Sequence, residues 1–191
     1  MSVRGGEGRS ATEGRSATEG GSQMSEKDTL VVLGASYDSV SDAQVDYEAV
    51  KDLYAAAGVG HDFDAAIVER GDDGKVKVAK KHEASTRHGA WEGLAIGACA
   101  AILPGIGLGV GAAAGAGIGA IAGHVKGGMK DSDLKQLGAV LDKNEAGLIV
   151  IYATNMADQV AASLKAEDRY VSEAMNVDAD ALAKQTKEAE K

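Results

Sequence analysis

The stretch GAWEGLAIGACAAILPGIGLGVGAAAGAGIGAIAGHVKGG, residues 89–128, governs the organisation of the rest of the chain. It holds half of the protein's 26 glycines, and between residues 90 and 125 its only formally charged side chain at pH 7 is Glu92. The glycines form two series with a spacing of four residues: Gly89, Gly93 and Gly97, then Gly107, Gly111, Gly115, Gly119 and Gly123. Residues four apart share one face of an α-helix. The spacing therefore predicts helices with a smooth face that a second helix can approach closely.

Pro104 and Gly105 divide this stretch into two predicted legs, residues 88–103 and 106–125. Proline removes a helical donor and restricts the residue before it, which predicts a turn. The legs would reach roughly 24 and 30 Å as helices, and a hydrocarbon core is about 30 Å thick. Basic residues flank both ends, which favours a hairpin with both ends on the cytoplasmic side: Lys80, Lys81, Arg87, Lys126 and Lys130.

Three interpretations of this hairpin remain open. It could be an integral membrane hairpin, or it could be buried between the subunits of a soluble homo-oligomeric ring, shell or particle. A flexible glycine-rich loop is the third interpretation, and the fourfold spacing speaks against it because a loop does not need a helical period.

The flanking segments predict one α+β domain formed by residues 28–87 and 129–191. The expected order is strand, helix, strand, strand, helix, strand: residues 30–33, 42–57, 63–70, 75–82, 131–141 and 147–152. This order is that of a ferredoxin-like βαββαβ core, an antiparallel sheet with helices on one face. The hairpin, residues 88–128, enters between the third strand and the second helix. A helix to about residue 166, a short strand near residues 169–174 and a terminal helix capped by Asp178 would be additions to the core.

Residues 1–27 are expected to be a disordered polar tail outside the fold. The hexapeptide Gly-Arg-Ser-Ala-Thr-Glu occurs at residues 8–13 and again at residues 14–19, and it offers no apolar side chain larger than alanine to a core.

Composition excludes several classes of function. The net charge of −9 argues against a general nucleic-acid-binding protein, which needs a basic face. The single cysteine, Cys99, excludes an intramolecular disulfide and a zinc site built on several thiolates. We interpret Cys99 as a small apolar packing residue.

Catalytic and cofactor chemistry is largely missing from the sequence. The glycines at residues 105–111 lack the preceding strand of a phosphate-binding loop. His82, His88 and His124 have no diagnostic metal-ligand spacing, so we predict neither a metal nor a cofactor. Trp91 is typical of an interfacial aromatic anchor. Glu92 is expected to lie at an interface or pair with Arg87 or His88, and the alternative is a ring of glutamates that lines an oligomeric pore.

Five features together resemble a bacterial family of predicted membrane proteins, the domain of unknown function twelve sixty-nine. They are the glycine-zipper hairpin and four strand motifs: TLVVLG at residues 29–34, DAAIVER at 64–70, DGKVKV at 73–78 and GLIVIY at 147–152. The resemblance covers roughly residues 29–180. It implies a membrane-associated α+β protein that is often associated with general stress, and it implies no catalytic residues.

We therefore expect a non-enzymatic, membrane-associated protein that self-assembles through its glycine hairpin, with the soluble domain on the cytoplasmic side. A soluble cytoplasmic homo-oligomer that buries the hairpin between subunits is the first alternative. A regulatory domain that binds a small molecule or a metal is the second.

Overall fold

The most apolar strand of the sequence lies at the centre of the sheet. The computed structural model describes residues 28–59, 62–72, 76–82, 93–103, 115–142 and 145–178, together with residues 181 and 184. In these residues β4 (Ala146–Ala153) pairs antiparallel with β1 (Asp28–Tyr37) and with β2 (Phe63–Arg70). β3 (Val76–His82) pairs with β2, and β5 (Arg169–Val177) pairs with β1. The described strands thus form one five-stranded antiparallel sheet in the order β3-β2-β4-β1-β5.

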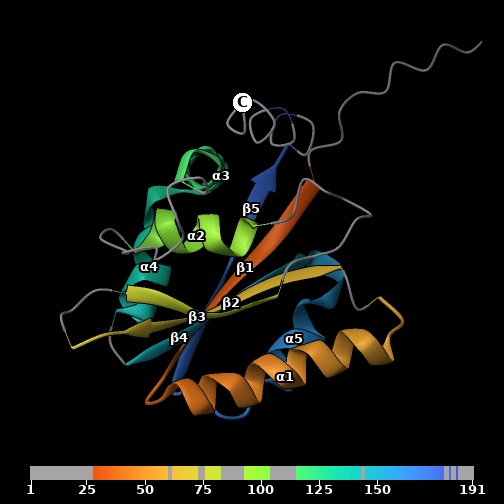
Figure 1. Cartoon of the computed structure of the whole chain (residues 1–191). Coiled ribbons are helices and arrows are strands. Elements are labelled where there is room, and N and C mark those ends of the chain that lie inside the picture. The colour runs from red at the N-terminus through yellow and green to blue at the C-terminus, as the bar shows by residue number, and fades with distance from the viewer. Residues whose placement is uncertain are drawn as a thin grey trace, which may run out of the picture.

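Helices cover both faces of this sheet. The described part of the chain contains five α-helices: α1 (Val40–Ala56), α2 (Leu94–Ile102), α3 (Gly115–Gly128), α4 (Asp131–Leu141) and α5 (Ala157–Ser163). A short 3₁₀ turn, η1 (Thr154–Met156), precedes α5. Figure 1 shows α1 and α5 on one side of the sheet and α2, α3 and α4 on the other. The mixed α/β architecture and the antiparallel sheet that the sequence predicts are confirmed.

The expectation that the helices share one face is wrong, and the composition of the inner strands gives the reason. Alternate residues of a strand point to opposite faces. On β1, Leu30 and Val32 belong to the core beneath α2, α3 and α4, whereas Val31 and Leu33 belong to the core over α1 and α5. Both faces of the inner strands are apolar, so both must be covered.

Helix α1 matches its predicted face but not its predicted start. The three- and four-residue spacing predicts one buried face made of Ala43, Tyr47, Val50, Tyr54 and Ala57. The first four are buried, whereas Ala57, the C-cap residue, is exposed. The sequence predicts a helix from residue 42, yet α1 begins at Val40 and is capped by Ser39, whose Oγ accepts a hydrogen bond from the backbone N of Asp42 at 3.1 Å.

The connection from α5 to β5 is anchored by a buried carboxylate. Asp46 on α1 has no exposed surface and accepts hydrogen bonds from the Tyr37 hydroxyl at 3.1 Å and from the backbone N of Lys165 at 2.9 Å. The backbone N of Ala166 donates to both of its oxygens, at 3.2 and 3.0 Å. This carboxylate therefore connects β1, α1 and the segment after α5 on one side of the sheet.

Candidate functional site

Helix α2 begins at a glycine and is fixed by a buried carboxylate. Gly93 takes a left-handed backbone conformation, with φ of 81°, which a side chain would strain. Just after it, the backbone N of Ala95 donates a hydrogen bond of 2.9 Å to Oδ2 of Asp64 on β2, which is 1 % exposed. The negative charge of Asp64 thus meets the positive end of the helix dipole.

The side chains of α2 form part of the core. Leu94, Ala95, Ala98 and Cys99 have no exposed surface and pack in the cluster that contains β1, β2 and β4. Burial, and to a lesser degree the charge of Asp64, raises the pKa of the Cys99 thiol. The thiol therefore stays neutral and acts as an apolar packing group, in agreement with the interpretation from the sequence.

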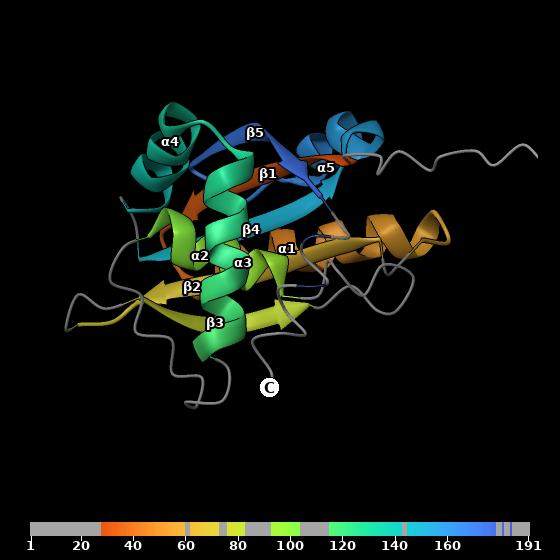
Figure 2. The same ribbon diagram turned by 90° about the horizontal axis from the view of Figure 1, so that it is seen from above.

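Helix α3 crosses over α2 on the side away from the sheet (Figure 2). The two helices touch at Gly97, where an added Cβ would overlap Ile121 Cγ2 and lie 2.8 Å from Ile121 Cβ. Ile121 and Val125 are buried on the inner face of α3. A glycine of α2 therefore accepts a large aliphatic side chain of α3, which is the close approach that the glycine spacing predicts.

The outer face of α3 carries glycines with no neighbour. Gly119, Gly123 and Gly127 follow at steps of four residues, and no atom of the described chain lies within 4 Å of a Cβ added at any of them. We call these three residues the open glycine face. They border a groove of about 580 Å³, which is lined also by Ala120, His124, Gly128, Asn176 and Asp178.

The far wall of this groove is the end of β5. Nε2 of His124 accepts a hydrogen bond from the backbone N of Asp178 at 3.2 Å. The carbonyl oxygen of Asn176 lies so close to Gly128 that any side chain there would overlap it. Helix α3 is thus docked on β5 at two positions one turn apart.

The structure gives different roles to the glycines that the sequence groups together. Gly93 starts α2, Gly97 is buried against α3, and Gly119 and Gly123 are open. Gly115 is the first residue of α3. The remaining predicted site residues lie outside the described residues: Gly89, Trp91, Glu92, Gly107 and Gly111.

Several residues of the site were missed by the sequence analysis. Gly127 continues the four-residue spacing from Gly123, so the sequence alone would have placed it on the same helix face. The placement of Asn176 and Asp178 against α3 had no sequence signal, because their segment is distant along the chain. His124 was considered only as a metal ligand, and in the described part of the chain no three metal-binding side chains converge.

The described helices cover only parts of the two predicted legs. Helix α2 has 9 residues within the first leg, and α3 has 14 residues, from Gly115 in the second leg to Gly128. The leg residues 88–92 and 106–114 lie outside the described residues. Among the described residues, no helix combines the length and the apolar character that crossing a bilayer requires.

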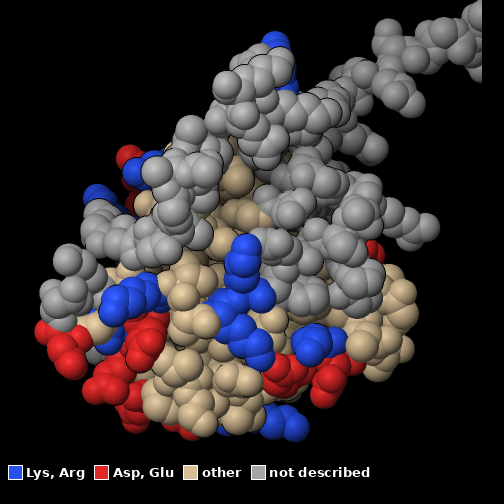
Figure 3. Space-filling model, in the orientation of Figure 1, with Lys and Arg blue, Asp and Glu red and all other residues tan. Residues whose placement is uncertain are grey.

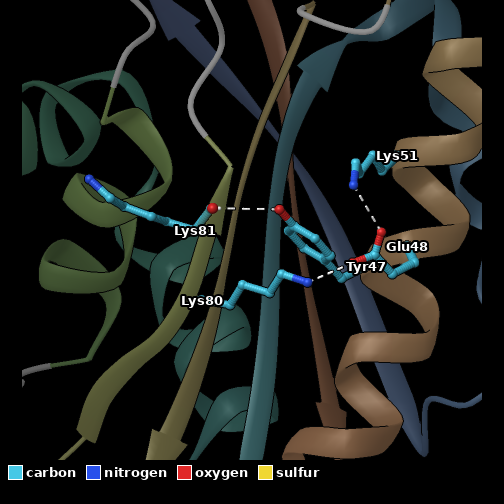
Figure 4. Close-up of polar contacts among 5 residues, drawn as sticks. All are labelled: Tyr47, Glu48, Lys51, Lys80 and Lys81. Atoms are coloured by element: carbon cyan, nitrogen blue, oxygen red, sulfur yellow. Dashed lines mark hydrogen bonds and ion pairs between the residues drawn. The ribbon is translucent and has the colours of Figure 1, made fainter.

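A second polar cluster lies where α1 meets β3. Lysine and arginine side chains gather across the middle of the face seen in Figure 3, with acidic side chains below them. In Figure 4, Lys80 Nζ reaches Glu48 Oε1 at 2.6 Å and lies 4.5 Å from the centre of the Tyr47 ring, and Lys51 Nζ reaches Glu48 Oε2 at 3.1 Å. These hydrogen bonds from Lys80 and Lys51 lower the pKa of Glu48. Each oxygen of the Glu48 carboxylate is paired with one lysine, and because Lys80 comes from β3, we interpret the cluster as the contact that holds α1 to the sheet edge.

Comparison with known proteins places the chain in a family. A family model with the description "Protein of unknown function (DUF1269)" matches residues 86–186, which include α2 to β5. The chain belongs to this family. The resemblance seen in the sequence began earlier, at residue 29, so three of its strand motifs lie before the matched range. No curated protein and no solved structure matches the chain.

Proposed function

We propose that this member of the family is a non-enzymatic protein that self-associates through the open glycine face of α3. The observation that carries the proposal is the absence of any described atom within 4 Å of a Cβ built at Gly119, Gly123 or Gly127. In a helix interior each glycine costs about 1 kcal/mol relative to alanine. Three such glycines at helical spacing, with no packing partner among the described residues, are accounted for if another helix packs on them.

The occupant we propose is the same face of a second copy. The contact of Gly97 with Ile121 supports this choice, because it shows a glycine of this fold receiving a helix at close range. A two-fold pairing brings the same patch of both subunits together, so it needs no second complementary surface. The three glycines carry no charge themselves, and the exposed Lys126, three residues after Gly123 on the same helix, borders them.

The direct test adds bulk to the open face. Gly123→Leu is expected to abolish self-association in sedimentation and crosslinking experiments, because a leucine side chain blocks the approach of a second backbone. Ala55→Leu is the matched control, since Ala55 is exposed on α1 on the other side of the sheet. Unchanged assembly of Gly123→Leu, or equal loss in both variants, would reject the proposal.

Membrane association on the cytoplasmic side accompanies this proposal, and a soluble cytoplasmic oligomer is its alternative. What supports a membrane is the apolar composition of residues 93–125 and the basic residues beside it, Lys126 and Lys130. Extraction of membranes with alkaline carbonate separates the two. Protein that stays in the pellet until detergent is added favours the membrane, and a uniform large species in the supernatant favours the soluble oligomer.

The ferredoxin-like classification of the core is likewise a proposal, and it concerns only the order of the elements along the chain, because α1 and α4 lie on opposite faces of the sheet. It is supported by the order β1, α1, β2, β3, α4, β4, in which α2 and α3 fall between β3 and α4. An experimental structure of the chain tests it.

A further inference from the structure

His124 links α3 to the segment that leaves β5. Its Nε2 accepts the hydrogen bond from the backbone N of Asp178, so this nitrogen carries no proton and the ring is assigned as neutral, with its proton on Nδ1. The carboxylate of Asp178 has a separate partner, because its Oδ1 accepts a hydrogen bond of 2.9 Å from the backbone N of Ala181. The junction between α3 and β5 thus depends on one ring nitrogen that acts as an acceptor.

In the described part of the chain, the charged group that shares the groove with this ring is the Asp178 carboxylate. Among the described residues that line the groove, His124 and Asp178 are the titratable ones. Lys126 on the same helix is exposed. His124 follows Gly123 directly and lies about one turn before Gly127, and it lines the same groove as the open glycine face.

We propose that His124 is a proton-operated latch between α3 and the end of β5, and that it makes self-association depend on pH. A histidine ring takes up a proton between about pH 5 and 8. The imidazolium donates from both nitrogens, so it cannot accept the Asp178 N–H. The ring then turns toward the Asp178 carboxylate, in competition with Ala181, and the Asp178 amide is released.

The link to assembly rests on the self-association proposed above. In a two-fold pairing both subunits would bring a protonated His124 to the edge of one interface. In each subunit the wall of the groove has then lost the hydrogen bond between the Asp178 N–H and His124, so the end of β5 is no longer fixed against α3 beside the interface. Acidification therefore weakens self-association.

The latch itself is tested by amide hydrogen exchange at Asp178, corrected for the intrinsic dependence of exchange on pH. From about pH 7.5 to 5.5, protection in the wild type should fall roughly tenfold, the scale of one lost hydrogen bond. In His124→Gln the side-chain carbonyl can accept the same bond but does not titrate, so protection should stay constant. Constant protection in the wild type, or equal loss in both proteins, overturns the latch.

Two further measurements keep the outcome decisive. If His124→Gln does not fold, the wild type is followed by NMR as a function of pH. The chemical shifts of the His124 ring and of the Asp178 amide should then change with the same midpoint. A different midpoint, or no change, for the Asp178 amide overturns the latch. Repeating the exchange experiment in Gly123→Leu shows whether the latch works without assembly.

The regulatory link is tested by sedimentation of wild type and His124→Gln at both pH values. The dissociation constant of the wild type should rise at least about fivefold more than that of the variant on acidification. Equal weakening overturns the regulation while leaving self-association intact. A wild type that is monomeric at both pH values rejects the proposed function instead, and the exchange result then decides the latch alone.

Discussion

At the scale of single residues, one amino acid performs opposite tasks in the two glycine helices. Gly97 has a neighbour too close for any side chain, whereas Gly119 has no neighbour at all within 4 Å in the described chain. The sequence shows the same residue type with the same spacing at both positions. The two glycines differ only in their surroundings: Ile121 packs on Gly97, whereas Gly119 is exposed to solvent.

Substitution by alanine should therefore have opposite effects at these two positions. Gly97→Ala pushes α3 away from α2 and should lower the free energy of unfolding by about 1–3 kcal/mol. Gly119→Ala adds a methyl group in open space and should raise it by up to about 1 kcal/mol through helix propensity. Urea denaturation of both variants measures the effects. A stabilised Gly97→Ala would contradict the packing described here.

At the scale of secondary-structure elements, two of the described helices begin where a side-chain oxygen accepts a hydrogen bond from one of their first N–H groups. Ser39 does this for α1, and Asp64 does it for α2 from a neighbouring strand. The Ser39 cap comes from the residue next to its helix, whereas Asp64 lies on a strand about 30 residues before the helix that it caps. A sequence window that covers one helix can find only caps of the first kind.

The cap of α1 gives a prediction with a built-in control. Ser39→Ala should lower the free energy of unfolding by about 1 kcal/mol, because the backbone N of Asp42 loses its acceptor. Ser41→Ala should change it by less than about 0.5 kcal/mol, since Ser41 is exposed and does not cap the helix. Thermal or urea unfolding decides between them. A larger loss for Ser41→Ala would show that the helix starts two residues later.

At the scale of the whole molecule, the glycine segment is part of the core. Residues of α2 are buried against β1, β2 and β4, so the sheet face beneath them would be exposed without α2. An inserted hairpin that merely projects from a domain could be removed without this consequence.

Deletion of residues 88–128 should therefore prevent folding. The remaining chain would leave one apolar face of the sheet uncovered, and we expect loss of cooperative unfolding and of near-ultraviolet circular dichroism. Deletion of residues 1–27 is the control, and it should leave the melting temperature unchanged. If the chain without residues 88–128 unfolds cooperatively on heating, the hairpin is a separable insertion and this prediction is wrong.

Buried tyrosines determine how the molecule responds to alkaline pH. Burial is the main cause that raises the pKa of Tyr37 and Tyr54, and it raises the pKa of Tyr152 to about 12. A folded-state pKa above the unfolded value of about 10 stabilises the fold fully below pH 10, and this stability is lost as the pH rises toward and through the folded-state pKa.

The expected result is cooperative unfolding above about pH 10, in which tyrosinate absorbance and loss of circular dichroism change together. In Tyr152→Phe, the unfolding transition should move to higher pH. The comparison is made after the difference in unfolding free energy between the two proteins at neutral pH has been subtracted. Ionisation of all tyrosines well before the loss of structure would contradict their burial.

Much of the fold could be predicted because local patterns determine it. Each described strand overlaps a predicted one, since runs such as residues 147–152 are too apolar to lie anywhere but inside a sheet. The buried face of α1 follows from its helical spacing, and the separation of the two glycine legs follows from Pro104. For the candidate site, the sequence predicted that the glycines form a packing face; within the described chain Gly97 takes such a contact with Ile121, and the role of the glycine series in self-association stays a prediction.

Other features were decided by the tertiary structure, because they depend on residues that meet only after folding. Which glycines pack and which stay open depends on the path of α3 across α2. The covering of both sheet faces depends on how β1 and β4 pair, and the contact of His124 with Asp178 joins segments 54 residues apart. Sequence spacing carries the geometry within one helix, but it carries no information about which surface that helix will meet.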